Sequence, residues 1–143
     1  SDFIIGYPEE NDNDFKNTID LIDKIRFINS YSFIFSSRPG TVAADLELVD
    51  KNKSKKRLEI IQKKLFDNQI KKNKSLEHSI VKVLVENRMK DGIKLFGRTE
   101  YMTSVIFEGG LENIGKIVEV KITGSNQNSL FGELNKDYKK KVA

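Results

Sequence analysis

The sequence predicts an α+β fold in which a short β-α-β segment and one long helix precede a five-stranded antiparallel β-barrel. Three observations lead to this prediction. The second half of the chain contains five short segments in which apolar and polar residues alternate, a pattern typical of half-buried strands. Residues 51–74 are mostly good helix formers and include no glycine or proline. Two apolar strand-like runs flank a helical repeat within residues 1–36.

The alternating segments of the second half are separated by glycine-bearing turns at residues 91–92, 109–110 and 124. In the first segment Val81, Val83 and Val85 share one face. An open sheet of this length would expose two edges, whereas closure into a barrel hides them. We therefore expect a small barrel of the kind that binds oligonucleotides, with strands at residues 79–86, 94–101, 104–108, 117–123 and 129–134.

The β-α-β segment begins with an apolar run at residues 3–5, which is interpreted as a strand buried on both faces, as in parallel sheets. Asn11 is a predicted N-cap, and Asp14 three residues later completes a capping box. Apolar residues then recur at helical spacing, and an alternating strand follows over residues 31–36. Carboxylates on the exposed side of this helix are interpreted as solvated, namely Asp12, Asp14, Asp20 and Asp23.

A single β-α-β unit needs further strands on its sheet, and this sequence does not contain them. We therefore expect the chain to be the C-terminal piece of a longer protein. Uncovered apolar sheet faces tend to find partners, so self-association through residues 1–49 is also expected.

The composition excludes several classes of protein. The 143 residues include no cysteine and one histidine, which rules out disulfides, thiolate catalysis and cysteine-held zinc or iron–sulfur centres within this sequence. No catalytic residue and no metal ligand is assigned. No apolar run reaches the length of a membrane span, so the expectation is a cytoplasmic protein with no membrane partner.

The charge is distributed unevenly along the chain. Residues 50–76 carry ten basic and three acidic residues, whereas residues 1–49 carry four basic and nine acidic ones. This basic linker and a lysine-rich tail after residue 135 predict an electrostatic footprint for nucleic acid. The charge alone is equally consistent with a solvated lysine-rich helix that packs by one narrow stripe of Leu58, Ile61, Leu65 and Gln69.

Six stretches of the second half carry a specific combination of residues: Val83-Leu84-Val85-Glu86, Leu95-Phe96-Gly97-Arg98-Thr99, Val105-Ile106-Phe107-Glu108-Gly109, Gly115-Lys116, Val120-Lys121-Ile122-Thr123 and Ser129-Leu130-Phe131-Gly132-Glu133-Leu134. Together they resemble a TRAM domain over residues 77–135. More narrowly, they resemble the TRAM domain at the end of the radical-SAM tRNA methylthiotransferases. TRAM domains also occur on other RNA-modifying enzymes, so the beginning of the chain decides the family.

The beginning of the chain reads Asp2-Phe3-Ile4-Ile5-Gly6-Tyr7-Pro8-Glu9-Glu10, and later Ser36-Ser37-Arg38-Pro39-Gly40-Thr41. These segments are similar to the end of the radical-SAM barrel in the same enzymes, where they commonly read D-x-I-V-G-F-P-G-E-T and S-x-R-P-G-T-x-A. Two positions depart from that pattern, since Glu9 replaces the glycine and Asn11 replaces the threonine. Pro39-Gly40 suits a type II turn.

The resemblance implies three parts in the family's order: residues 1–49 as the C-terminal part of a radical-SAM barrel, residues 50–76 as a connecting helix, and residues 77–138 as an RNA-binding TRAM domain. It also implies a function in tRNA modification, as part of an enzyme that methylthiolates N6-isopentenyladenosine beside the anticodon. Such an enzyme uses S-adenosylmethionine and two [4Fe-4S] clusters. This cysteine-free chain holds none of these cofactors and is expected to be inactive alone. The alternative is a standalone RNA-binding module of the TRAM or oligonucleotide-binding type.

The resemblance also suggests where S-adenosylmethionine would lie. Ligands of such barrels collect at the C-terminal ends of the strands. Gly6 and Pro8 follow the first predicted strand, and Ser36 and Arg38 follow the second, so these four residues are candidates for part of the cofactor wall. The competing interpretation is that glycine and proline after a strand are ordinary turn residues.

The expected RNA partner is a tRNA anticodon stem-loop. Arg98 is the first candidate contact, because a guanidinium in a polar neighbourhood suits a phosphate or a base edge. Phe96 and Tyr101 are candidates for base stacking, whereas Phe107 is expected in the core. The basic residues around the first turn of the barrel complete the predicted site: Arg88, Lys90 and Lys94.

Overall fold

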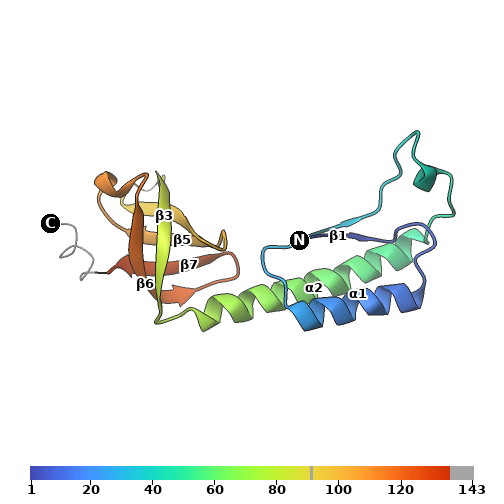
Figure 1. Ribbon diagram of the computed structural model, residues 1–143, viewed down its shortest axis with the longest axis horizontal. Coiled ribbons are helices and arrows are strands. Elements are labelled where there is room, and N and C mark those ends of the chain that lie inside the picture. Colours follow the sequence, from blue (N-terminus) through green and yellow to red (C-terminus); the bar gives the residue numbers. More distant parts are fainter. Residues whose placement is uncertain (91, 136–143) are drawn as a thin grey trace. The chain divides into compact units, whose positions relative to one another are not determined.

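The computed structural model describes residues 1–90 and 92–135, and the chain forms two compact units, Ser1–Gln69 and the part from Ile70 onward. The first unit contains strand β1 (Asp2–Ile5), helix α1 (Asp12–Ile25), strand β2 (Tyr31–Ile34), a short 3₁₀ turn η1 (Val42–Ala44) and most of helix α2 (Lys51–Ser75) (Figure 1). None of the helices in the described part of the chain is both long and apolar enough to cross a membrane.

Helix α1 begins where the sequence predicts. The side chain of Asn11 accepts hydrogen bonds from the backbone N–H groups of Asn13 and Asp14, at 2.8 and 3.0 Å. The carboxylate of Asp14 accepts one from the backbone N–H of Asn11 at 3.1 Å, which completes the predicted capping box. The helix ends at Arg26, which adopts the left-handed conformation and donates its N–H to the carbonyl of Ile22.

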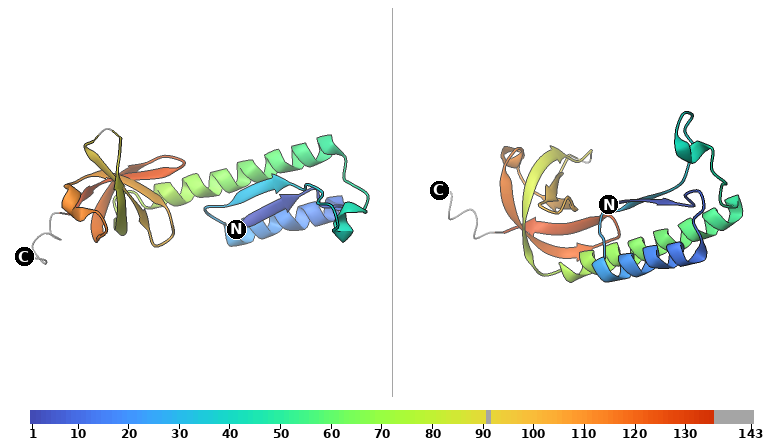
Figure 2. Two further views of the ribbon diagram at one scale, coloured as in Figure 1. Left: turned by 90° about the horizontal axis from the view of Figure 1, so that it is seen from above. Right: turned by 45° about the vertical axis from the view of Figure 1, so that its right-hand side comes forward.

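Strands β1 and β2 pair in parallel, as expected for a β-α-β unit. Phe3 and Ile5 point into a core that includes Ile22 of α1 and Ile61 of α2, and Figure 2 shows α1 running alongside α2 in this unit. The opposite face of the sheet is uncovered within the described chain: Ile4 is 58% exposed and its register partner Phe33 is 54% exposed. The prediction that residues 3–5 are buried on both faces is therefore wrong, because the described chain supplies a layer for one face only.

The predicted stripe on α2 packs into this core. Ile61 and Leu65 are buried, Leu58 packs against them, and the side chain of Gln69 accepts a hydrogen bond from the backbone N–H of Asn29 at 2.7 Å. Two polar residues that the stripe did not include, Ser54 and Arg57, are also buried, and both lie near the beginning of the helix.

The second unit is a closed barrel formed by five strands: β3 (Ile80–Arg88), β4 (Lys94–Thr99), β5 (Ser104–Glu108), β6 (Ile117–Ser125) and β7 (Ser129–Leu134), with a 3₁₀ turn η2 (Leu111–Asn113) between β5 and β6. The strand order around the barrel is β3-β4-β5-β7-β6. Four neighbouring pairs are antiparallel, and β5 and β7 are parallel. The predicted all-antiparallel barrel is wrong in this detail for a geometrical reason. Directions cannot alternate around a closed ring with an odd number of strands.

The barrel core contains the inward residues of every strand, including Phe107, which is buried as predicted. Two glycines allow neighbouring strands to approach closely. A Cβ atom on Gly97 would collide with the carbonyl of Leu84, and a Cβ on Gly132 would collide with the carbonyl of Lys121. Of the three predicted glycine-bearing turns, the one at residues 91–92 falls partly on Asp91, which lies outside the described residues. The predicted turn at residue 124 is wrong, because Gly124 lies within β6 and pairs with Phe131 of β7. The predicted basic tail and the end of the predicted domain at residue 138 also lie outside them.

Candidate nucleic-acid interface

The outward face of β4, β5 and β7 carries three of the six predicted RNA-binding residues. Leu95, Gly97 and Thr99 point inward, so the alternating residues Lys94, Phe96 and Arg98 point outward. The register of the three strands aligns these residues with outward residues of β5 and β7 in cross-strand rows. One row is apolar, and a polar row lies on each side of it.

Arg98 is half-buried and is held by two contacts on this face. Its Nε atom lies 3.3 and 3.4 Å from the carboxylate oxygens of Glu86 on β3. Its guanidinium carbon lies 5.4 Å from the centre of the Phe96 ring, which is a cation–π distance. The two predicted contact residues are therefore adjacent, and Arg98 already has a carboxylate partner.

The other predicted RNA contacts are placed at the ends of β3 and β4. The guanidinium of Arg88 donates hydrogen bonds to the carbonyl of Gly92, so it stabilises the turn between these strands. Lys90 and Lys94 are exposed on either side of that turn. Tyr101 lies in the turn after β4, away from the first turn, and the ammonium of Lys72 sits 5.9 Å from its ring centre. The structure thus brings Arg98, Phe96 and Lys94 onto one face, whereas Tyr101 belongs to another turn.

One aromatic residue on this face was missing from the sequence-based site. Phe131 of β7 is 36% exposed and is the register neighbour of Ile106 on β5, which in turn neighbours Phe96. The alternation along β7 indicates that Phe131 points outward, because its neighbour Leu130 is buried. The neighbouring positions of Phe96 and Phe131 could not be inferred from alternation alone.

A shallow pocket of about 260 Å³ opens beside Phe131 on this face. Eight residues line it: Lys94, Ile106, Phe107, Glu108, Thr123, Phe131, Gly132 and Glu133. Its volume lies below the usual range for drug-sized ligands, and such a hollow suits one planar ring better than a whole cofactor.

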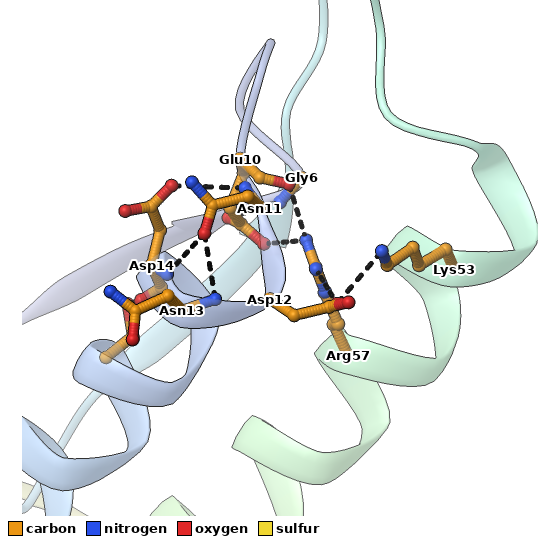
Figure 3. Close-up of polar contacts among 9 residues, drawn as sticks. Gly6, Glu10, Asn11, Asp12, Asn13, Asp14, Lys53 and Arg57 are labelled. Atoms are coloured by element: carbon orange, nitrogen blue, oxygen red, sulfur yellow. Dashed lines mark hydrogen bonds and ion pairs between the residues drawn. The ribbon is translucent and has the colours of Figure 1, made fainter.

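The loop between β1 and α1 forms a second polar centre, in the first unit (Figure 3). The buried guanidinium of Arg57 donates to the backbone carbonyl of Glu10 at 2.9 Å and to a carboxylate oxygen of Glu10 at 2.6 Å. Its other terminal nitrogen donates to the carboxylate of Asp12 at 2.6 Å, and the ammonium of Lys53 contacts the same oxygen at 2.9 Å. We call these four residues the Arg57 cluster.

The Arg57 cluster changes the interpretation of the helix carboxylates. Asp12 is exposed, as expected for a solvated residue, yet it pairs with two cations of α2. Hydrogen bonds from Lys53 and then from Arg57 lower the pKa of Asp12 below its ordinary value. Asp23 likewise pairs with Lys64 at 2.7 Å. The prediction that these two carboxylates are only solvated is wrong, because the sequence did not reveal which helix would pack beside α1.

The four candidates for the cofactor wall follow the parallel strands at the same edge of the sheet. The N–H of Phe35 donates to the carbonyl of Ile5 at 2.8 Å, so β2 continues beside β1 up to this edge. Ser36 and Arg38 are exposed there. Pro39-Gly40 forms the predicted turn, with Gly40 at φ +80° and the N–H of Thr41 donating to the carbonyl of Arg38.

Gly6 and Pro8 are buried, and the surroundings of Gly6 explain why glycine stands there. It has a φ of +69°, and a Cβ atom would collide with the side chain of Ser54. Its N–H donates to the carboxylate of Glu10 at 2.9 Å. Glu9 takes a φ of +66°, so the position at which the resemblance expects glycine keeps a conformation that glycine adopts most easily.

The residues present do not suit an iron–sulfur cluster. The sequence has no cysteine, and clusters of this class are held by cysteine thiolates. Among the described residues, no three histidine, aspartate or glutamate side chains come together in a way that could hold a metal ion.

Comparison with known proteins agrees with the barrel geometry. The TRAM domain family matches residues 74–134. Over 143 residues and its full length, the chain is 76% identical to the tRNA-2-methylthio-N(6)-dimethylallyladenosine synthase of Pelagibacter ubique, of which it covers 32%. It is 49% identical over 135 residues to the synthase of the same name from Ruthia magnifica, and 40% identical over 136 residues to that of Rickettsia akari, covering 30% and 31% of those proteins. The chain thus spans about a third of the length of these relatives. The chain therefore contains a TRAM domain and is similar over its whole length to part of the tRNA-2-methylthio-N(6)-dimethylallyladenosine synthases.

Proposed function

We propose that this chain supplies RNA binding to an enzyme that methylthiolates N6-isopentenyladenosine next to the anticodon of tRNA. The observation that carries the proposal is the 76% identity, across the whole chain, to a protein named for that product. The TRAM match over residues 74–134 supports RNA as the partner of the barrel. The expected target is the anticodon stem-loop, and the expected location is the cytoplasm.

The binding face that we propose is the outward side of β4, β5 and β7. Arg98 would contact the RNA directly, supported by Phe96 and by the exposed Lys94 on the same strand. Lysines of α2 would add sequence-independent attraction to phosphates. Most of the affinity would then be electrostatic, and binding would weaken steeply as the salt concentration rises.

The test is a titration of labelled anticodon stem-loops, with and without the isopentenyl group, at two salt concentrations. Arg98→Ala is expected to weaken binding by about 1–3 kcal/mol, because a direct charge-assisted contact is lost. Lys82→Ala is the matched control, because it removes one exposed cation from β3, where its register partner is Glu119 of β6. Selectivity for the isopentenyl group is not expected from this chain.

Two results would contradict the proposal. Salt-independent binding would rule out the electrostatic mechanism, and equal affinities of the wild type and Arg98→Ala would remove Arg98 from the interface.

A second candidate function is a standalone RNA-binding module, favoured by the closure of the barrel within residues 80–134. The length of the native open reading frame distinguishes the two, since the enzyme requires a cysteine triad elsewhere in the polypeptide.

We further propose that the edge after β1 and β2 forms part of the S-adenosylmethionine site in the complete enzyme. Arg38 is the strongest of the four candidates, because it is exposed at this edge and a guanidinium suits the carboxylate of the cofactor. Gly6 and Pro8 would act by shaping the loop, since the N–H of Gly6 already donates to Glu10. The cofactor would supply the radical chemistry, and the two clusters would be held by cysteines that this sequence lacks.

Self-association is proposed for the uncovered face of the two-stranded sheet. Ile4, Tyr31 and Phe33 are exposed side by side on β1 and β2, and an apolar patch of this kind favours a partner. Sedimentation of the chain over a range of concentrations should show association, and Phe33→Glu should abolish it. A wild-type chain that stays monomeric at every concentration would contradict this.

A further inference from the structure

The barrel contains the same three-residue sequence twice, as Leu95-Phe96-Gly97 on β4 and Leu130-Phe131-Gly132 on β7. In both copies the leucine is fully buried in the core and the glycine allows the adjacent strand to approach. In both copies the phenylalanine points outward. The two phenylalanines are placed on either side of Ile106 of β5, so Phe96, Ile106 and Phe131 form one apolar row across three strands.

The residues that follow the two copies carry opposite charges. Arg98 follows the first and Glu133 follows the second. Strand β4 is antiparallel to β5, whereas β7 is parallel to it, so the two copies run in opposite directions. As a result Arg98 and Glu133 lie on opposite sides of the apolar row. Arg98 is in a row with Ser104 and Ser129, and Glu133 is in a row with Glu108 and Lys94.

The two sides of the apolar row therefore offer different chemistry. The row of Arg98 has one guanidinium and two hydroxyls, which are hydrogen-bond donors that suit a phosphate, and the guanidinium is also paired with Glu86 of β3 through its Nε atom. The row of Glu133 has two adjacent carboxylates, which accept hydrogen bonds, and the row continues to Lys121 of β6. The pocket beside Phe131 lies on this second side, with Glu108 and Glu133 among its lining residues.

We infer that this face binds one unpaired nucleotide of RNA in a fixed direction and prefers a base that carries an exocyclic amino group. The base stacks on Phe131 and Ile106, its amino group donates to Glu133, and the phosphate lies toward Arg98. Aromatic rings stack on all bases, so stacking supplies affinity without selectivity. The carboxylate supplies the selectivity, because cytosine offers an amino group where uracil offers a carbonyl oxygen. This inference rests on the proposed RNA-binding function.

The choice of Phe131 over Phe96 as the stacking ring follows from their surroundings. The guanidinium of Arg98 covers one side of Phe96 at 5.4 Å. Phe131 is the more open of the two and lines the pocket. A base on Phe131 can reach Glu133, which is two residues away on the same strand and therefore on the same face.

The experiment compares the binding of oligo(C) and oligo(U) of equal length to the full 143-residue chain at low salt. Cytosine and uracil have rings of the same size, so a difference in affinity between the two polymers reports on the amino group and not on ring size. The wild type is expected to bind oligo(C) roughly five- to tenfold more tightly than oligo(U). Phe131→Leu is expected to weaken the binding of both by about fivefold or more, because it keeps an apolar side chain and removes the ring.

Glu133→Gln is expected to reduce the preference for oligo(C) to less than about twofold, because the neutral amide accepts a weaker hydrogen bond than a carboxylate. Glu119→Gln on β6 is the matched control, because it removes an outward carboxylate from another part of the barrel, and the preference should persist. Circular dichroism of each variant verifies that the barrel is folded.

The inference is overturned if the wild type binds oligo(C) and oligo(U) equally, or if the preference survives in Glu133→Gln. It is also overturned if Phe131→Leu binds both polymers as the wild type does. In each of these cases the proposed function would still stand if the chain binds the anticodon stem-loop and Arg98→Ala weakens that binding. Absence of any binding to the stem-loop would instead remove the proposed function itself.

Discussion

Among the ion pairs of the described residues, the one whose loss should destabilise the first unit most is that of Arg57 with Glu10. The side chain of Arg57 is 4% exposed and that of Glu10 is 11% exposed, so their ion pair is almost fully shielded from water. Truncation to alanine would leave the mostly buried Glu10 carboxylate with the N–H of Gly6 as its one hydrogen-bond donor from the described residues. Breaking a buried pair by removing one partner costs about 3–5 kcal/mol.

The expected loss of stability in Arg57→Ala can be compared with the contribution of a neighbouring ion pair that is exposed to water. Lys53 contacts the same Asp12 oxygen, but the two side chains are 45% and 82% exposed. Exposed pairs contribute about 0–1 kcal/mol, because water and salt screen them. Lys53→Ala is therefore the matched control for Arg57→Ala, since both variants remove one cation from the first turns of α2.

The assay is native-state hydrogen exchange, which reports the stability of each unit separately. In Arg57→Ala the protection of the amides of Ile5 and Ile22 should fall by roughly 100-fold or more, since about 1.4 kcal/mol corresponds to a factor of ten. The amide of Leu130 in the barrel serves as an internal reference and should not change. A fall of less than tenfold at Ile5 and Ile22, or an equal fall in Lys53→Ala, would refute the reasoning.

Two further predictions concern stability. Gly97→Ala should destabilise the barrel by about 1–3 kcal/mol in urea unfolding, because its Cβ would collide with a backbone carbonyl, whereas Gly124→Ala, with no atom within 4 Å of the new Cβ, should stay within about 0.5 kcal/mol of the wild type. The pKa of Asp12 is lowered from its ordinary 3.8 in the folded state, so its contribution to stability is present above that pH and is lost as the pH falls through the lowered value. Acid unfolding monitored by circular dichroism should therefore show that Asp12→Asn lacks this pH-dependent contribution to stability. Identical acid transitions of the wild type and the variant would contradict the prediction.

Local features of the fold could be predicted because their causes lie within a few residues. The capping box of Asn11 and Asp14 depends on a spacing of three residues. The turn at Pro39-Gly40 depends on the allowed φ angles of those two residues. The inward position of Phe107 follows from the period of two along β5. In each case the sequence contains both the group and its partner.

The features that could not be predicted depend on partners far apart in the sequence. Arg57 was missed because an arginine in a lysine-rich helix resembles a solvated cation until the loop at Glu10 packs against it, 47 residues away in the chain. Ile4 was expected to be buried because an apolar run does not reveal whether the chain supplies a layer for both faces. The stripe of α2 was recognised, but the carboxylates that pair with its other residues were not.

The amino-acid sequence by itself determined the order of the strands and helices, the inward face of the barrel strands, and which family the chain resembles. Those properties follow from local spacing and residue type. Only the tertiary structure decided which strands become neighbours. Closure of an odd number of strands requires a parallel pair, and the pairing of β5 with β7 brings Phe131 beside Ile106 and sets Glu133 and Arg98 on opposite sides of the same row. The candidate site therefore depends on how neighbouring strands are aligned. That alignment cannot be inferred from the alternation of apolar and polar residues along a single strand.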